Sequence, residues 1–229
     1  MVDTDSGPYH ERFHILDDAL GPHHERFYIL DDALGIFRID ERLYRVHRYL
    51  LIRESGFFRD MFSCPSGDTQ DVEGLTDENP IILAGTTKME FESVLQFLYF
   101  GMHDDYKASL EVWLAMLSIS TRLLFDKIRQ RAIKEITAQL DRMDPINLIL
   151  LATEHDVPQW LQPAYERLVS RAEPLSHAEA KTLDLPTAMM LMRSRELHHR
   201  AGNPRGPGWG GSVNLSNVVR SEVNTMRSA

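Results

Sequence analysis

Strand-sized apolar runs mark the first clearly patterned part of the chain, between residues 27 and 39. Residues 27–30 and 36–39 are such runs, and an Asp-Asp-Ala-Leu-Gly segment at 31–35 separates them. Aspartate and glycine between two apolar runs are typical of a tight connection, which predicts a β-hairpin that begins a sheet.

Two short helices are predicted directly after this hairpin. Tyr44 and Val46 alternate as at the end of a strand, and Leu50 with Leu51 supplies one turn of apolar helix. Ser55 has the side chain of an N-cap, so we expect it to begin a second helix. The apolar residues of that helix fall at helical spacing: Phe57, Phe58, Met61 and Phe62.

Helical spacing continues after a polar loop at 65–79 and a short apolar strand at 80–83. Thr87 and Glu90 have the spacing of a capping box, and the helix that they begin is predicted to stop at Gly101. Two further helices are predicted from apolar stripes, the first with Leu110, Trp113, Leu114 and Leu117, the second with Ile128, Ala132, Ile136 and Leu140.

The chain beyond residue 140 is predicted to be an all-helical extension over 141–200. Asp144 and Pro145 give an N-cap followed by proline at the first helical position, and Pro158 opens another helix. Ser176 and Glu179 form a second capping-box pattern, and a last helix runs from Pro186 to about His199. Residues 201–229 are glycine-rich, proline-rich and polar, so we predict a disordered tail.

A tandem duplication occupies the N-terminus. Residues 10–21 are repeated at 24–35, and the two copies differ only at position 14 against 28. Two copies are too few for a stacked repeat protein, so the segment is interpreted as a local duplication of one strand. The second copy joins the predicted hairpin. The first copy, within residues 1–24, is expected either to be mobile or to pair as an extra strand with the exposed sheet edge of a second chain.

Composition excludes several function classes. The protein has a net charge of −9, whereas nucleic-acid-binding domains usually have a basic surface. We therefore expect no direct nucleic-acid partner. The single cysteine, Cys64, rules out an internal disulfide framework. The N-terminus does not resemble a secretory signal, and no run of about 18 apolar residues is present. We therefore expect an intracellular protein, cytoplasmic or nuclear, that does not associate with a membrane.

One sequence pattern is typical of a zinc site, so we keep metal chemistry as an alternative function. His10, Glu11 and His14 match the His-Glu-x-x-His pattern of zinc hydrolases. The flanking residues do not give a long apolar-faced helix, and Tyr28 replaces the distal histidine in the second copy. A convincing third ligand is also missing from the sequence. We predict no cofactor, no metal site and no enzyme, with zinc hydrolysis as a distant alternative.

The residues between 44 and 62 resemble the signature of the BTB/POZ domain, an aromatic residue, histidine, leucine, serine and two phenylalanines at fixed spacing. The matching positions are Tyr44, His47, Leu51, Ser55, Phe58 and Phe62. The resemblance covers residues 25–140 and implies an α+β fold, a small sheet flanked by a helical cluster. Residues 141–200 resemble the short helical extension found in a large fungal group of such proteins, with Trp160-Leu161 and Arg195-Glu196 at the corresponding places.

The resemblance implies a protein–protein interaction module. Such domains commonly self-associate, or associate with other BTB proteins, through their first helices and an N-terminal strand. A homo- or hetero-oligomeric scaffold is therefore the predicted function. The candidate interface residues are Phe27, Ile29, Tyr49, Leu51, Phe57 and Phe58.

An adaptor of a cullin-type ubiquitin ligase is the alternative that the resemblance implies. In such adaptors the loop after the second helix often carries an apolar residue two positions before a glutamate. The candidate cullin-facing residues here are Val72, Glu73 and Leu75, and their spacing does not follow that pattern strictly.

Overall fold

The computed structural model describes residues 34–64, 73–101 and 105–201, together with positions 216, 217, 219, 220 and 223. The chain divides into two compact units, one up to Lys88 and one from Met89 onward. The division lies inside the stretch 25–140 that the sequence predicts as one domain. Each unit is described by itself.

A three-stranded sheet organises the first unit. The strands are β1 (Leu34–Ile39), β2 (Arg42–His47) and β3 (Ile81–Ile82), in the order β2-β1-β3. The two longer strands pair antiparallel, with Leu34 opposite His47 and Ile39 opposite Arg42, whereas β3 runs parallel to β1. Phe37, in the central strand, is completely buried.

The hairpin is one strand later than the sequence predicts. The observed connection is Asp40-Glu41, where Asp40 takes a φ of +50°, a conformation that aspartate tolerates better than most residues. Leu34 and Gly35 lie in β1, so the expected turn at 31–35 is wrong at its C-terminal end. The expected partner strand, 27–30, lies outside the described residues. Two adjacent carboxylates, followed three residues later by a glycine, favour the earlier turn in the sequence, whereas the turn in the structure uses the single Asp40.

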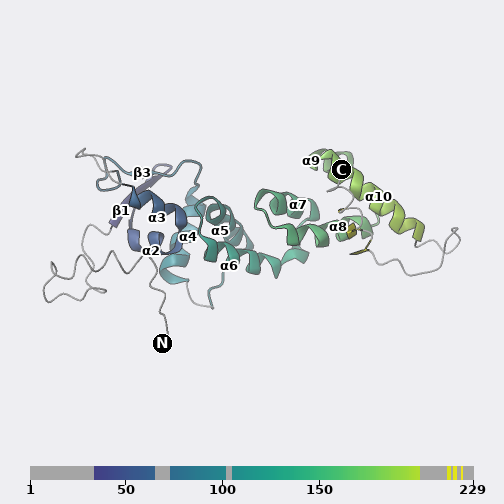
Figure 1. Cartoon of the computed structure of the whole chain (residues 1–229), viewed down its shortest axis with the longest axis horizontal. Helices are drawn as coiled ribbons and strands as arrows, with labels where there is room; N and C mark the ends of the chain where they lie inside the picture. The colour runs from purple at the N-terminus through teal and green to yellow at the C-terminus, as the bar shows by residue number, and fades with distance from the viewer. Residues whose placement is uncertain are drawn as a thin grey trace, which may run out of the picture. The chain divides into compact units, whose positions relative to one another are not determined.

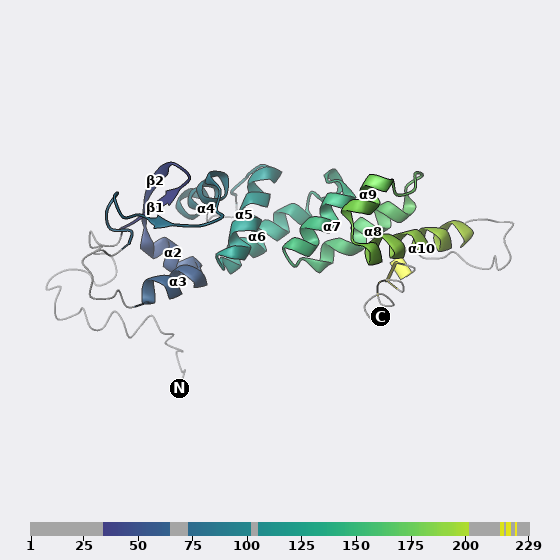
Figure 2. The same cartoon turned by 90° about the horizontal axis from the view of Figure 1, so that it is seen from above.

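Ser55 joins the helices α2 (Arg48–Glu54) and α3 (Gly56–Ser63), and both lie on one face of the sheet (Figure 2). Its backbone N–H donates to Leu51 O at 2.9 Å, which ends α2. Its side-chain Oγ accepts a hydrogen bond from the Phe58 N–H at 3.1 Å, which confirms the predicted N-cap of α3. Because Ser55 is fully buried, this hydrogen bond also satisfies a group that water cannot reach.

Aromatic packing around Phe58 forms the centre of the first unit. Its ring meets Phe37 of β1 edge to face, with centroids 5.7 Å apart, and it contacts Phe57 and Phe62 of its own helix. Edge-to-face contacts add to the burial of apolar area because the positive ring edge meets the negative ring face. Phe58 therefore fastens α3 to the central strand.

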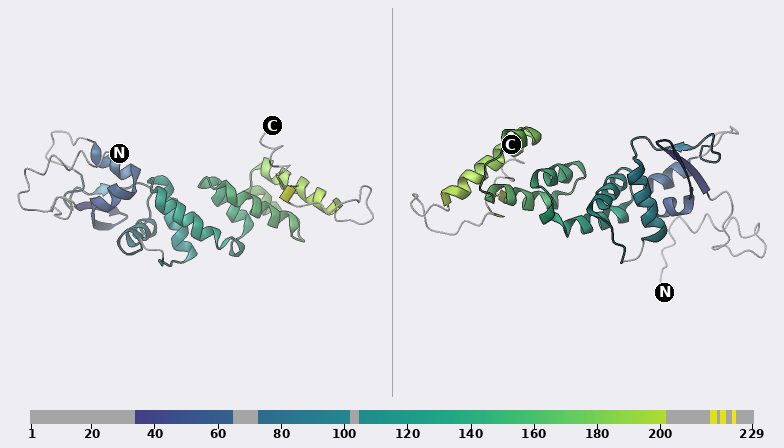
Figure 3. Two further views of the ribbon diagram at one scale, coloured as in Figure 1. Left: turned by 60° about the horizontal axis from the view of Figure 1, so that its bottom comes forward. Right: turned by 180° about the vertical axis from the view of Figure 1, so that it is seen from behind.

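The second unit begins with α4 (Lys88–Phe100), α5 (Leu110–Arg122) and α6 (Asp126–Thr137). α5 and α6 pack side by side, as the teal helices of Figure 3 show. The rings of Phe97, Tyr106 and Trp113 make edge contacts with one another between α4 and α5. The stripe predicted as far as Leu140 ends earlier, because α6 stops at Thr137 and Leu140 begins the 3₁₀ turn η3 (Leu140–Arg142).

The predicted helices beyond residue 140 are present. They are α7 (Pro145–Glu154), the 3₁₀ turn η4 (Pro158–Trp160), α8 (Leu161–Ser170), α9 (His177–Thr182) and α10 (Leu185–Ala201). The Asp144 cap and the capping box of Ser176 and Glu179 are confirmed. α8 contacts both α7 and α10 (Figure 1).

Part of the predicted tail is described. Ala201 belongs to α10, and positions 216, 217, 219, 220 and 223 are helical. Figures 1 and 2 place these C-terminal positions (yellow) beside α10, and Val219 is completely buried. The remaining residues predicted as a disordered tail lie outside the described part of the chain.

Replacing Phe58 by alanine should lower the free energy of unfolding by about 3–5 kcal/mol, because it leaves a cavity at the centre of the first unit. Phe100→Ala is the matched control, since Phe100 is 79% exposed and its loss should change stability by less than about 0.5 kcal/mol. Chemical denaturation of the full chain measures both. Equal effects of the two substitutions would contradict the packing role of Phe58.

Candidate functional site

The six signature residues belong to β2, α2, α3 and the junction between the two helices, and they have mainly structural roles. Leu51, Ser55 and Phe58 are completely buried. Tyr44 and Phe62 are half-buried, and His47 is exposed at the start of α2, where its side chain does not cap the helix. The signature spacing therefore encodes the contacts that hold the helical pair against the sheet.

Burial separates the candidate interface residues into two groups. Leu51 and Phe58 are inside the fold, so their assignment to an interface is corrected: their apolar area is already buried within the chain. Tyr49 is 57% exposed and Phe57 is half-buried, so both keep surface for a partner. Leu51 and Phe58 follow the same helical pattern as the exposed residues, which is why sequence alone did not separate them.

Two arginine side chains of α2 lie over aromatic rings of the helical pair α2–α3. The Arg53 guanidinium carbon is 5.4 Å from the centroid of the Tyr49 ring, and its Nε donates to Glu54 Oε1 at 2.6 Å. The Arg48 guanidinium carbon is 4.9 Å from the centroid of Phe62. Such cation–π contacts restrain the long arginine side chains, and each guanidinium covers one face of its aromatic ring. Tyr49 and Arg53 thus form an ordered aromatic and cationic patch on α2, called here the α2 patch.

The loop before β3 presents an exposed leucine on a fixed turn. Gly74 takes a φ of +83°, its N–H donates to Asn79 O at 2.7 Å, and its carbonyl accepts from the Ile36 N–H at 2.9 Å. A Cβ at this position would lie 2.5 Å from Ile81 Cδ1, so glycine is required there. Leu75, the next residue, is 48% exposed.

The surroundings of Leu75 are acidic. Glu73, Asp77 and Glu78 are exposed in the same loop. Of the candidate cullin-facing residues, Glu73 and Leu75 are therefore at the surface, and Val72 lies outside the described residues. Phe27 and Ile29 of the candidate interface also lie outside them, as do His10, Glu11 and His14 and the whole first copy of the duplication.

Partly buried hydrogen bonds join the helices around residue 140. Trp160 is completely buried, and its Nε1 donates to Thr137 Oγ1 at 2.8 Å. Arg167 of α8 donates to the carbonyls of Leu140 and Met143, at 3.0 and 2.7 Å. The extension therefore packs directly on α6. In the sequence, Trp160 is identified only through the resemblance to the helical extension of a family, and that resemblance does not predict this contact.

The C-terminal end of α7 is held by Arg129 of α6. Arg129 Nη2 donates to His155 O at 2.6 Å and to Asp156 O at 3.1 Å. Both carbonyls lie just past the last turn of α7, where intrahelical donors are lacking. His155 itself is 6% exposed, and this burial lowers the pKa of its imidazole below the ordinary value of 6.5.

Glu90 is a structural residue whose role the sequence did not reveal. Its Oε1 accepts from Ser118 Oγ at 2.5 Å, and its Oε2 pairs with Arg122 Nη2 at 2.9 Å, both on α5. Glu90 is 8% exposed, so its charge is compensated mainly by these contacts. The capping-box spacing predicts only a local role for the Glu90 side chain, whereas in the structure this side chain also joins α4 to α5.

In the described part of the chain, the histidine, cysteine, aspartate and glutamate side chains form no group of three that could hold a metal ion. No helix within the described ranges is long and apolar enough to cross a membrane.

Comparison with known families identifies the sheet and its helices. A family model described as the BTB/POZ domain matches residues 35–140, from β1 to the start of η3. This stretch is a BTB/POZ domain. Among curated proteins, the comparison finds no match. The matched stretch begins ten residues after the predicted start at 25, and it includes all six signature positions.

The BTB/POZ domain confirms the predicted α+β class, with a helical extension after it. BTB/POZ domains are in general protein-interaction modules, so the chain carries a module of that kind.

Acidification should destabilise the protein through His155. Because its pKa is lower in the folded chain, the unfolded chain binds the proton more readily. The stability that neutral His155 contributes is complete above pH 6.5, falls as the pH drops below 6.5, and levels off below the folded pKa. Urea denaturation at pH 7.5 and pH 5.5 should show this loss in the wild type and a smaller loss in His155→Gln. An equal loss in both proteins would exclude His155 as the cause.

Proposed function

We propose that the protein is a scaffold that self-associates, or associates with other BTB proteins, through the helical pair α2–α3. The observation that carries this proposal is the α2 patch, in which Tyr49 keeps 57% of its surface exposed next to Arg53. Tyrosine and arginine are among the residues that most often dominate the binding energy of protein interfaces.

The chemistry of the helical pair supports association rather than solvation alone. Phe57 and Met61 of α3 are half-buried, so part of their apolar surface remains available to a partner. The Arg53 side chain is already ordered by its contacts with Tyr49 and Glu54, so less rotamer entropy is lost when a partner covers it. A second copy of the same surface offers matching aromatic and cationic groups, as a two-fold interface requires.

Tyr49→Glu should weaken self-association by about 30-fold, equivalent to about 2 kcal/mol, because it buries a charge where an aromatic ring would anchor the interface. Sedimentation equilibrium of the full chain measures the dissociation constant. Tyr99→Glu is the matched control, since Tyr99 is also exposed, at 38%, but lies on α4. A monomeric wild type, or equal weakening by both substitutions, would refute self-association through α2.

A cullin-type ligase adaptor is the second candidate function, favoured by one observation. Leu75 is an exposed leucine held on the Gly74 turn and surrounded by acidic residues. An apolar side chain on a fixed loop can dock with a smaller ordering cost than one on a mobile loop, and nearby carboxylates can steer it to a basic partner surface.

Leu75→Asp should remove cullin recovery in an affinity purification of the tagged full chain if this loop carries the adaptor role. Ile82→Asp is a control of similar exposure, at 59%, in the neighbouring strand β3. Recovery of a cullin with the wild type and the control, but not with Leu75→Asp, would support the adaptor role. Recovery of BTB chains alone, with no cullin, would leave the scaffold as the function.

A further inference from the structure

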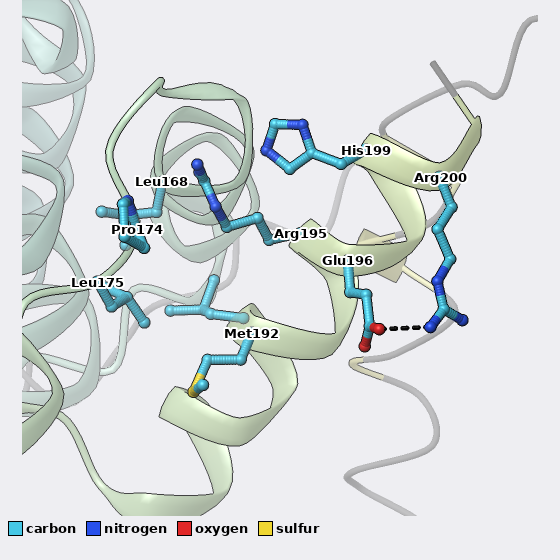
Figure 4. A pocket seen from close by; sticks show the side chains of 9 residues that line it. Leu168, Pro174, Leu175, Met192, Arg195, Glu196, His199 and Arg200 are labelled. Carbon is cyan, nitrogen blue, oxygen red and sulfur yellow. Dashed lines mark hydrogen bonds and ion pairs between the residues drawn. The ribbon is translucent and has the colours of Figure 1, made fainter. Parts of the chain in front are cut away.

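A cavity of about 460 Å³ lies in the helical extension, between α10 and the end of α8 (Figure 4). Its volume is within the range of pockets that bind small ligands or anchoring side chains. The apolar part of its lining comes from Leu168 of α8, from Pro174 and Leu175 of the following loop, and from Leu191 and Met192 of α10. It is distant in sequence from the α2 patch and does not depend on the function proposed above.

Two arginine forks fix the loop that forms one wall. Arg171 pairs with both carboxylate oxygens of Glu179 at 2.7 Å and also donates to the carbonyls of Glu173 and Pro174. The Arg171 guanidinium lowers the pKa of Glu179 from 4.5 to about 2. The wall that carries Pro174 and Leu175 is therefore held by contacts within the chain before any partner binds.

Arg195 holds the opposite wall to the same loop. From α10, its Nη1 donates to Arg171 O at 2.6 Å and its Nη2 to Ala172 O at 2.6 Å, with Val169 O a longer contact at 3.4 Å. These carbonyls lie at the C-terminal end of α8, which stops at Ser170. Backbone carbonyls carry no full negative charge, and the partial negative charge at the C-terminal end of α8 offsets only part of the positive charge of Arg195.

The other charged residues of the cavity lining compensate each other. Glu196 Oε1 pairs with Arg200 Nη2 at 2.5 Å. In Figure 4 the Arg195 side chain and the His199 ring extend toward Leu168 and Pro174, whereas the Glu196–Arg200 pair, which also lines the cavity, extends in another direction. An apolar cavity thus has a net cationic edge in a chain whose overall charge is −9.

We propose that this cavity binds a short segment of another protein in which a bulky apolar side chain lies next to an aspartate or glutamate. The apolar side chain enters between Leu168, Leu191 and Met192, and the carboxylate lies at the edge near Arg195 and His199. Buried apolar area provides the affinity. The charge selects acidic over neutral or basic segments, since an only partly compensated cation at the edge favours an anion.

A peptide selection on the full chain tests the proposal. A display library of random heptapeptides is selected on the wild type and counter-selected on Met192→Glu, which puts a carboxylate at the cavity. Met192 is 56% exposed, so the substitution should not disturb folding. We expect the enriched peptides to combine a leucine, phenylalanine or similar residue with an adjacent aspartate or glutamate.

Fluorescence anisotropy with an enriched peptide, capped at both ends, then measures affinity. Met192→Glu should weaken binding at least tenfold, whereas Met192→Lys, which removes the same apolar group but adds a positive charge, should weaken it much less. Met189→Glu is the matched control, at 51% exposure on the same helix but outside the cavity lining, and should bind like the wild type.

Four results would overturn the proposal. The first is no peptide enriched over the Met192→Glu counter-selection, and the second is enrichment of basic or uncharged peptides. The third is equal weakening by Met192→Glu and Met189→Glu. Displacement of every selected peptide by dodecanoate at lower concentration would instead assign the cavity to a fatty acid, and would also overturn it.

Discussion

The contact between the rings of Phe58 and Phe37 is the interaction on which the first unit depends. It joins the second short helix to the central strand, and the buried Ser55 hydroxyl sets the angle at which that helix begins. The exposed position of Tyr49 follows from these two constraints, because residues two positions apart lie on opposite sides of a helix, so Tyr49 faces outward when Leu51 faces inward. The surface offered to a partner is thus a product of the core beneath it.

The second unit depends on polar contacts between its helices, most of them partly buried. Trp160 bonds to Thr137, Arg129 to the end of α7, and Glu90 to α5. Each of these contacts crosses from one helix to another, so each specifies a relative position that apolar packing alone would leave less defined. A polar group left unsatisfied in such a place is costly, which favours one arrangement over its neighbours.

The sequence predicts local structure well where a side chain acts on its own backbone. Ser55, Asp144 and the Ser176 box were found in this way, since a cap needs only a few consecutive residues. It does not predict contacts between distant residues. The cross-helix role of Glu90, the burial of Leu51 as opposed to Tyr49, and the cavity beside Arg195 all depend on which helices meet, and no spacing within one helix contains that information. The hairpin shows a third case, in which two plausible turns compete and the less conspicuous Asp40 is used.

The hydrogen bonds across residue 140 have a consequence for any attempt to divide the chain by its family match. The BTB/POZ match ends at residue 140, but Trp160 and Arg129 join α6 to the helices after that point, and Arg167 donates to the carbonyl of Leu140 itself. A fragment cut at 140 would leave the carbonyl of Leu140 without its arginine donor and uncover the face of α6 that meets η4. Aggregation or poor folding of such a fragment would then result from the newly exposed surface. An oligomer formed by the fragment would give no information about how the intact protein associates.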